Sequence, residues 1–170
     1  DVVVGGLGLG YTARAVLEDR RVACLTVIEA LGEVIAWHER ALLPDAEVLT
    51  ADPRVELVQG DFFALVDDER GLDPQAPGRV FHAVLVDIDH TPSHLLAPGH
   101  AGFYTAAGLT RLTRQLRPGG VFGLWSDDPP DGDFEDLLRQ VFTEAQAHVV
   151  SFPNFYTGGE SASTVYVAQR

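Results

Sequence analysis

The chain has 170 residues, of which 46% are apolar and 22% are charged, and it carries a net charge of −13 at pH 7. This composition excludes a disordered chain, and the acidic balance argues against a nucleic-acid partner, because binding to phosphates needs a cationic surface. No apolar run reaches the length of a membrane span, and the absence of lysine excludes Schiff-base and P-loop chemistry.

Strand-like and helix-like segments alternate along the chain. In chain order we expect strand Asp1–Val4, helix Tyr11–Leu17, strand Val22–Ile28, helix Leu31–Leu43, strand Val55–Val58, helix Phe62–Val66, strand Val80–Val86, helix Gly102–Leu116, strand Val121–Trp125, helix Asp133–Ala145, and strands His148–Phe152 and Thr164–Ala168. This alternation is typical of an α/β protein with a doubly wound, mostly parallel seven-stranded sheet. The last two strands follow each other without a helix, which predicts a hairpin with the last strand antiparallel.

The first strand runs into a loop that contains Gly5, Gly6, Gly8 and Gly10. Glycines allow positive φ and a close approach of the backbone to a ligand, and the next helix directs its N-terminus at that ligand. The pattern fits the NAD fingerprint poorly, because counting from Gly6 places Tyr11 at the third small position. A tight strand-to-helix turn without a ligand is the alternative.

Two carboxylates stand at the carboxyl ends of the next two strands. Glu29 ends the second strand, where a carboxylate can accept both hydroxyls of an adenosine ribose; a solvated charge near a helix N-terminus is the alternative. Asp61 follows the third strand and can accept from the exocyclic amine of adenine, while the backbone N–H of Phe62 reaches a ring nitrogen. Asp61 can also cap the helix that follows, and the two roles can coexist.

These features, with Leu116-Arg117-Pro118-Gly119-Gly120 before the fifth strand, occur in an order that resembles the class I S-adenosylmethionine-dependent transferases. Within that group the chain resembles the spermidine synthase family, in GGLGLG, VIEALGEVIAWHERALLP, DPRVELVQGDFFALV, AVLVDIDHTPSHLL and FPNFYTGGESASTVYVA. The resemblance implies S-adenosylmethionine, or its decarboxylated form, as cofactor. It also implies that Glu29 binds ribose, that Asp61 binds adenine, that Asp87 stands at the catalytic position and that Tyr156 lies by the amine substrate.

The chain departs from the family pattern at several positions. Gly8 stands where the family carries an aspartate that holds the donor's aminopropyl amine, and Trp125 replaces a polar residue. In Asp87-Ile88-Asp89-His90 the second carboxylate comes one position early. We therefore expect transfer of a methyl or related alkyl group to a small acceptor, which can be an amine. Aminopropyl transfer is the alternative, and a non-catalytic nucleoside-binding module is a third hypothesis.

The loop after the fourth strand holds the candidate catalytic groups. A neutral amine nucleophile must lose a proton, so Asp87 and Asp89 are candidates for a general base and for a group that stabilises charge. On a continuing strand they would share a face, and paired acids raise one another's pKa. Capping of the next turn is the alternative. His90, His94 and His100 could join them around a divalent metal, but the spacing matches no metal signature, so no metal is predicted.

Further expectations concern the whole protein. We expect a single domain over residues 1–170 that lacks its N-terminal part, because the sequence has no methionine and starts within a strand. Cys24 lies in an apolar run, which predicts a buried thiol in a reducing compartment and a cytoplasmic protein. On the second helix, Trp37 is expected in the core and His38 on the surface. A homodimer without a membrane partner is the last expectation.

Overall fold

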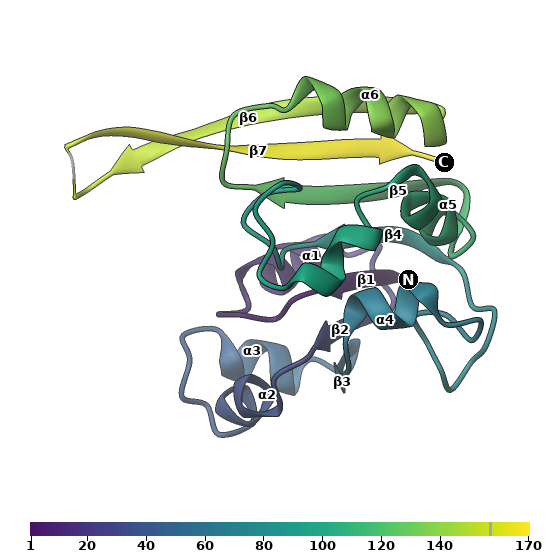
Figure 1. The fold of residues 1–170 in the computed structure, drawn as a ribbon. Helices are drawn as coiled ribbons and strands as arrows, with labels where there is room; N and C mark the ends of the chain where they lie inside the picture. The colour runs from purple at the N-terminus through teal and green to yellow at the C-terminus, as the bar shows by residue number, and fades with distance from the viewer. Residues whose placement is uncertain (157) are drawn as a thin grey trace.

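The computed structural model describes residues 1–156 and 158–170, which form one seven-stranded sheet with the strand order β3-β2-β1-β4-β5-β7-β6 (Figure 1). The strands are β1 (Val2–Gly5), β2 (Leu25–Glu29), β3 (Val55–Gln59), β4 (Phe81–Val86), β5 (Leu116–Ser126), β6 (Glu144–Asn154) and β7 (Gly159–Gln169). The helices are α1 (Tyr11–Glu18), α2 (Gly32–Glu39), α3 (Ala46–Ala51), α4 (Phe62–Asp67), α5 (Ala106–Thr113) and α6 (Gly132–Val141), with a 3₁₀ helix, η1 (Pro98–Gly102), before α5.

The strand pairing confirms the predicted fold class. In the sheet order, neighbouring strands pair in parallel from β3 through β2, β1 and β4 to β5. Strand β7 pairs antiparallel with both β5 and β6. The strand order reverses between β1 and β4, and in open α/β sheets ligands bind beyond the carboxyl ends of the strands at such a reversal. A ligand site is therefore expected at the loops that follow β1 and β4.

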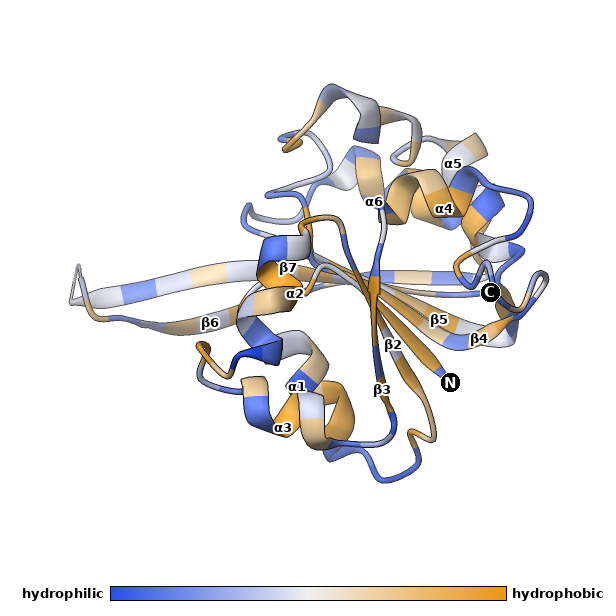
Figure 2. Ribbon diagram, turned by 90° about the horizontal axis from the view of Figure 1, so that it is seen from below, coloured by the Kyte–Doolittle hydropathy of each residue, from blue (hydrophilic) through white to orange (hydrophobic). Residues whose placement is uncertain are grey.

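Helices cover both faces of the sheet, with α1, α2 and α3 on one face and α4, α5 and α6 on the other (Figure 2). The alternation of side chains along β1 divides the core in the same way. Val3 packs in the cluster that contains Leu109 and Leu138, whereas Val2 and Val4 pack in the other cluster. Both faces of the strand are buried, which explains why its sequence is continuously apolar.

Several predicted elements needed correction. The helix expected over Gly102–Leu116 spans only Ala106–Thr113, because Thr105 caps its N-terminus and Leu116 already belongs to β5. The helix expected over Asp133–Ala145 ends at Val141, and β6 begins three residues later. The sequence analysis did not predict α3. Strands β6 and β7 have eleven residues each, and their hairpin projects beyond the rest of the sheet (Figure 1).

The assignments of Trp37 and His38 were reversed. Trp37 is 46% exposed, whereas His38 is completely buried. His38 lies four residues after Val34, so both face the interior from the same side of α2. Cys24 is only partly buried. Among the described residues, no helix has the length and apolar character that crossing a membrane requires.

Candidate functional site

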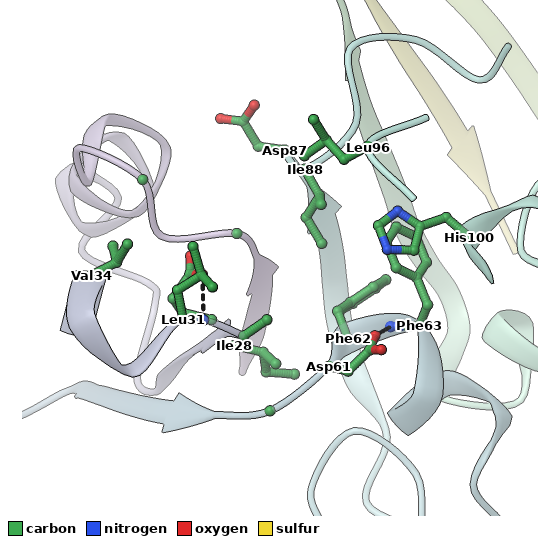
Figure 3. Close-up of a pocket in the computed structure, with 15 residues that line it drawn as sticks. Ile28, Leu31, Val34, Asp61, Phe62, Phe63, Asp87, Ile88, Leu96 and His100 are labelled. Atoms are coloured by element: carbon green, nitrogen blue, oxygen red, sulfur yellow. Dashed lines mark hydrogen bonds between the residues drawn. The ribbon is translucent and has the colours of Figure 1, made fainter. Parts of the chain in front are cut away.

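A cavity of about 300 Å³ lies at the carboxyl ends of the strands, where the strand order reverses. The loops after β1, β2, β3 and β4 all contribute to its walls. Figure 3 shows Leu31 and Val34 on one side of this cavity and His100 on the other. Six of the residues proposed from the sequence line the cavity: Gly6, Gly8, Glu29, Asp61, Phe62 and Asp87.

The loop between β1 and α1 requires glycine for steric reasons. Gly6 has a φ of +93°, and a Cβ there would lie 2.2 Å from the backbone oxygen of Asp87. Gly10, at the N-cap of α1, has a φ of +90°, and a Cβ would lie 2.6 Å from a methyl group of Leu49. Gly5 ends β1 against the ring of Phe62. These contacts bring the backbone close to β4 and leave Gly8 exposed at the cavity.

Glu29 connects two of the loops that form the cavity. Its Oε2 accepts a hydrogen bond of 3.0 Å from the backbone N–H of Leu7, and its Oε1 accepts one of 2.9 Å from that of Leu31. A carboxylate oxygen has two lone pairs, so each oxygen of Glu29 can still accept from a ligand hydroxyl. The half-buried carboxylate therefore orders the glycine loop and keeps acceptor capacity at the cavity.

Asp61 caps α4, as one of the two sequence hypotheses proposed. Its Oδ1 accepts from the backbone N–H groups of Phe63, at 2.9 Å, and Ala64, at 3.2 Å. These bonds fix the carboxylate at the end of β3 and use only one of its oxygens. The other oxygen, Oδ2, makes no hydrogen bond among the described residues, so it is free for a ligand donor. The ring of Phe62 beside it is buried.

Asp87 lies directly after β4 with an exposed side chain. Its Oδ2 accepts a hydrogen bond of 2.6 Å from the hydroxyl of Thr12, in the first turn of α1. This bond joins the helix after the glycine loop to the end of β4 and orients the Asp87 carboxylate. Asp87 lines the cavity, and Figure 3 shows its carboxylate at the edge of the labelled group, directed away from Asp61.

Asp89 has a different environment, and the expected pairing with Asp87 does not form. Asp89 is 1% exposed, is absent from the cavity wall and accepts three hydrogen bonds. They come from the backbone N–H of Leu96 at 2.7 Å, from Nδ1 of His100 at 2.8 Å and from the hydroxyl of Tyr104 at 2.9 Å. Burial, and then the charge of Asp89, hold the pKa of Tyr104 well above its ordinary value, so the phenol remains a donor.

The buried His38 packs against the glycine loop from the interior of the protein. Its Nε2 lies 3.0 Å from the backbone oxygen of Gly8, and its Cε1 would be 3.0 Å from a Cβ at Gly10. Because a carbonyl oxygen only accepts, Nε2 carries the hydrogen in this bond. The buried Nδ1 then has no partner among the described residues. The imidazole therefore fills the space under the loop and fixes one of its carbonyl groups.

Comparisons with known proteins show what the chain is similar to. No protein-family model matches the chain. Over 121 residues, or 71% of its length, the chain is 30% identical to a polyamine aminopropyltransferase from Pyrobaculum arsenaticum. The chain is homologous to this polyamine aminopropyltransferase and has a spermidine synthase-like fold. It spans 39% of that relative's length.

Solved structures agree on the spermidine synthase-like fold. The chain matches the spermidine synthase from Thermotoga maritima with a TM-score of 0.71 and 20% identity, covering 99% of this chain and 53% of that one. It also matches human methyltransferase-like protein 13 in complex with SAH, with a TM-score of 0.68 and 17% identity, covering 99% of this chain and 71% of that one. At these identities the two matches establish the fold alone.

Like Asp89, Tyr156 was proposed as a catalytic-site residue but does not line the cavity. The side chain of Tyr156 is fully exposed near the tip of the β6–β7 hairpin. Its predicted place beside an amine substrate remains a prediction. Among the described residues, no group of three or more His, Cys, Asp or Glu side chains could hold a metal ion. The ring centroids of His90 and His94 lie 5.1 Å apart, whereas His100 forms a hydrogen bond with Asp89.

The sequence analysis missed several residues in and around this cavity. It gave no role to Thr12, His38 or Tyr104, and it considered His100 only as a metal ligand. The spacing of His100 and Tyr104, four residues apart in a loop rich in polar residues, was an available signal. The position of Thr12 in the first turn after a glycine loop was another, because that turn faces the ligand side of the sheet.

Proposed function

We propose that this chain binds an adenosyl-sulfonium donor in the cavity and transfers its aminopropyl group to an amine acceptor. One observation carries the proposal: Glu29, Asp61 and Asp87 lie at or just after the carboxyl ends of three different strands and line one cavity. Homology to a polyamine aminopropyltransferase favours aminopropyl transfer over the methyl transfer that ranked first in the sequence analysis.

The cavity has acceptor groups where an adenosine needs them. Glu29 would accept from the ribose hydroxyls, with its position fixed by the N–H groups of Leu7 and Leu31. Asp61 would accept from the adenine amine through Oδ2, because its other oxygen caps α4. The glycine loop would approach the donor closely at Gly6 and Gly8.

Asp87 is the residue we place beside the reacting amine. The donor supplies an electrophilic carbon on a positively charged sulfur. The acceptor nitrogen forms a bond to that carbon while the carbon–sulfur bond breaks and leaves its electron pair on a neutral thioether. Asp87 takes the proton that the nitrogen loses, as a general base would. Thr12 keeps the carboxylate oriented for this transfer.

Methyl transfer is the second candidate, and Gly8 is the observation that favours it. A Cβ at Gly8 would meet no atom within 4 Å, so the glycine loop leaves open space there. The space carries no carboxylate to hold a donor's aminopropyl ammonium. It could accept the carboxylate group of ordinary S-adenosylmethionine without electrostatic repulsion.

Competition binding and product analysis distinguish these functions. The full-length protein is titrated with S-adenosylmethionine, with its decarboxylated form and with 5′-methylthioadenosine, and an amine mixture is then analysed by mass. Aminopropyl transfer predicts a preference of at least about tenfold for the decarboxylated donor, or about 1.4 kcal/mol, and products heavier by one aminopropyl group. Methylated products with the opposite preference would support the second candidate. Tight binding without any product would support a non-catalytic nucleoside-binding module.

A further inference from the structure

The Asp89–His100 pair presents an oriented imidazole to the cavity, and neither the homology nor the proposed transfer reaction accounts for it. His100 lines the cavity, with 16% of its side chain exposed, while Asp89 behind it is buried. Its Nδ1 is bonded to Asp89, and its Nε2 makes no hydrogen bond among the described residues. The geometry points to a role in ligand recognition: we propose that His100 selects a nucleobase with an exocyclic amine.

His100 lies at the end of the cavity where the base of the proposed nucleoside would lie. Its ring packs against that of Phe63, with centroids 4.1 Å apart and planes inclined by 30°. Phe63 follows Asp61 by two residues, and both residues line the cavity with His100. Leu31 and Val34 lie on the other side of the cavity (Figure 3), and the backbone N–H of Leu31 donates to Glu29 at the end of β2. A nucleoside with its ribose at Glu29 therefore extends its base towards Asp61 and His100.

Asp89 determines which atom of His100 can recognise the base. Three donors converge on Asp89, which fits an ionised carboxylate that only accepts. Nδ1 of His100 then carries the hydrogen, and in the neutral imidazole Nε2 keeps its lone pair for the cavity. Asp89 is thus a positioning residue, because it acts on the ligand through His100.

Two acceptors at the base end match the two hydrogens of an adenine amine. Asp61 Oδ2 and His100 Nε2 would each accept one of them, whereas an oxo group at the same position would face both lone pairs. The inference rests on the proposed function, since it assumes that the donor's nucleoside occupies this cavity. It adds that the site discriminates between adenine and 6-oxo bases, with His100 supplying part of the discrimination.

Binding of 5′-methylthioadenosine and 5′-methylthioinosine by calorimetry tests this inference without any turnover. His100→Phe keeps an aromatic ring against Phe63 and removes the acceptor. We expect it to weaken binding of the adenosine compound by about tenfold, the equivalent of about 1.4 kcal/mol, and not to weaken binding of the inosine compound, whose oxo group then faces one lone pair fewer. A merely structural role would weaken both compounds equally and leave the ratio of the two dissociation constants unchanged. His94→Phe, on the same loop but outside the cavity wall, is the matched control.

The outcomes separate this inference from the proposed function. An unchanged ratio in His100→Phe, with tight adenosine binding in the parent, would overturn the inference and leave the donor site standing. Failure of the parent to bind either compound would overturn both. A second measurement does not depend on a variant that folds: ¹⁵N NMR of the parent at about pH 8 should show hydrogen on Nδ1 of His100 and a lone pair on Nε2. Hydrogen on Nε2 there would also overturn the inference.

Discussion

The hydroxyl of Thr12, in the first turn of α1, donates a 2.6 Å hydrogen bond to Oδ2 of Asp87, at the end of β4. The two residues are separated by 75 positions in the sequence and meet because β1 and β4 are neighbours in the sheet. The bond fixes the direction of the carboxylate that the proposed chemistry uses as a base. Its energetic contribution should therefore appear in turnover more than in donor binding.

We expect Thr12→Val to lower turnover by about tenfold with little change in donor affinity, since a misdirected base slows proton transfer and leaves the nucleoside contacts intact. Asp87→Asn, which removes the base itself, should lower turnover by about 10²–10⁴-fold. Steady-state kinetics and donor titrations measure the two effects. Thr12→Ser keeps the hydroxyl and serves as the control. A Thr12→Val enzyme with parental turnover would show that the bond does not orient Asp87 for catalysis.

Replacement of Glu29 should affect donor binding instead. Glu29→Ala removes the acceptor of the Leu7 and Leu31 N–H groups together with the proposed ribose contact. Calorimetry with 5′-methylthioadenosine should give a loss of about 1.5–3 kcal/mol, the scale of hydrogen bonds to a charged group. Glu33→Ala, an exposed acid in the first turn of α2, is the matched control. Equal affinities for parent and Glu29→Ala would refute the assignment of the ribose site.

The sequence predicted the acids of the cavity because each lies at or just after the carboxyl end of a strand. Glu29 is the last residue of β2, Asp61 comes two residues after β3 and Asp87 comes directly after β4, and the carboxyl ends of parallel strands meet at one edge. The role of Asp89 could not be read in the same way. It depends on contacts to His100 and Tyr104 in a loop without hydrophobic periodicity, where the fold of the loop decides which carboxylate is buried.

His38 illustrates a different limit of the sequence analysis. Hydrophobicity placed Trp37 in the core, yet the helical spacing from Val34 turns His38 inwards. A buried imidazole is favourable there because its Nε2 finds the carbonyl of Gly8, which belongs to a loop 30 residues earlier. Local patterns carry no information about such a partner.

The contact between His38 and Gly8 leads to a prediction about the glycine loop. His38→Leu removes the donor to Gly8 together with a buried nitrogen, Nδ1, that has no partner. These effects oppose each other, so we expect the free energy of unfolding to change by less than about 1 kcal/mol. Affinity for 5′-methylthioadenosine should still fall by about tenfold, because the loop loses the bond that fixes its carbonyl.

Urea denaturation and calorimetry on the same preparations test this prediction, with Trp37→Ala as the control on the exposed side of α2. The control should retain parental affinity. A His38→Leu protein with parental affinity but much lower stability would assign His38 to the core alone.

Tyr104 predicts how stability depends on alkaline pH. Burial and the neighbouring Asp89 raise its pKa above the ordinary value of 10.0, so the folded protein keeps a proton that the unfolded chain releases. Below that value both states bind the proton, and the contribution of the hydrogen bond to Asp89 is fully present. Above it the unfolded state gains by ionisation, so the free energy of unfolding falls by up to about 1.4 kcal/mol per pH unit.

Tyr104→Phe cannot ionise and should be less stable than the parent at about pH 8, by about 1 kcal/mol for one lost hydrogen bond. The difference should shrink or reverse by about pH 11, as urea denaturation at a series of pH values can measure. Tyr11→Phe, at an exposed position, should give a curve parallel to that of the parent. If the difference between parent and Tyr104→Phe stays constant over this range, Tyr104 is not the group that links the loop after β4 to alkaline unfolding.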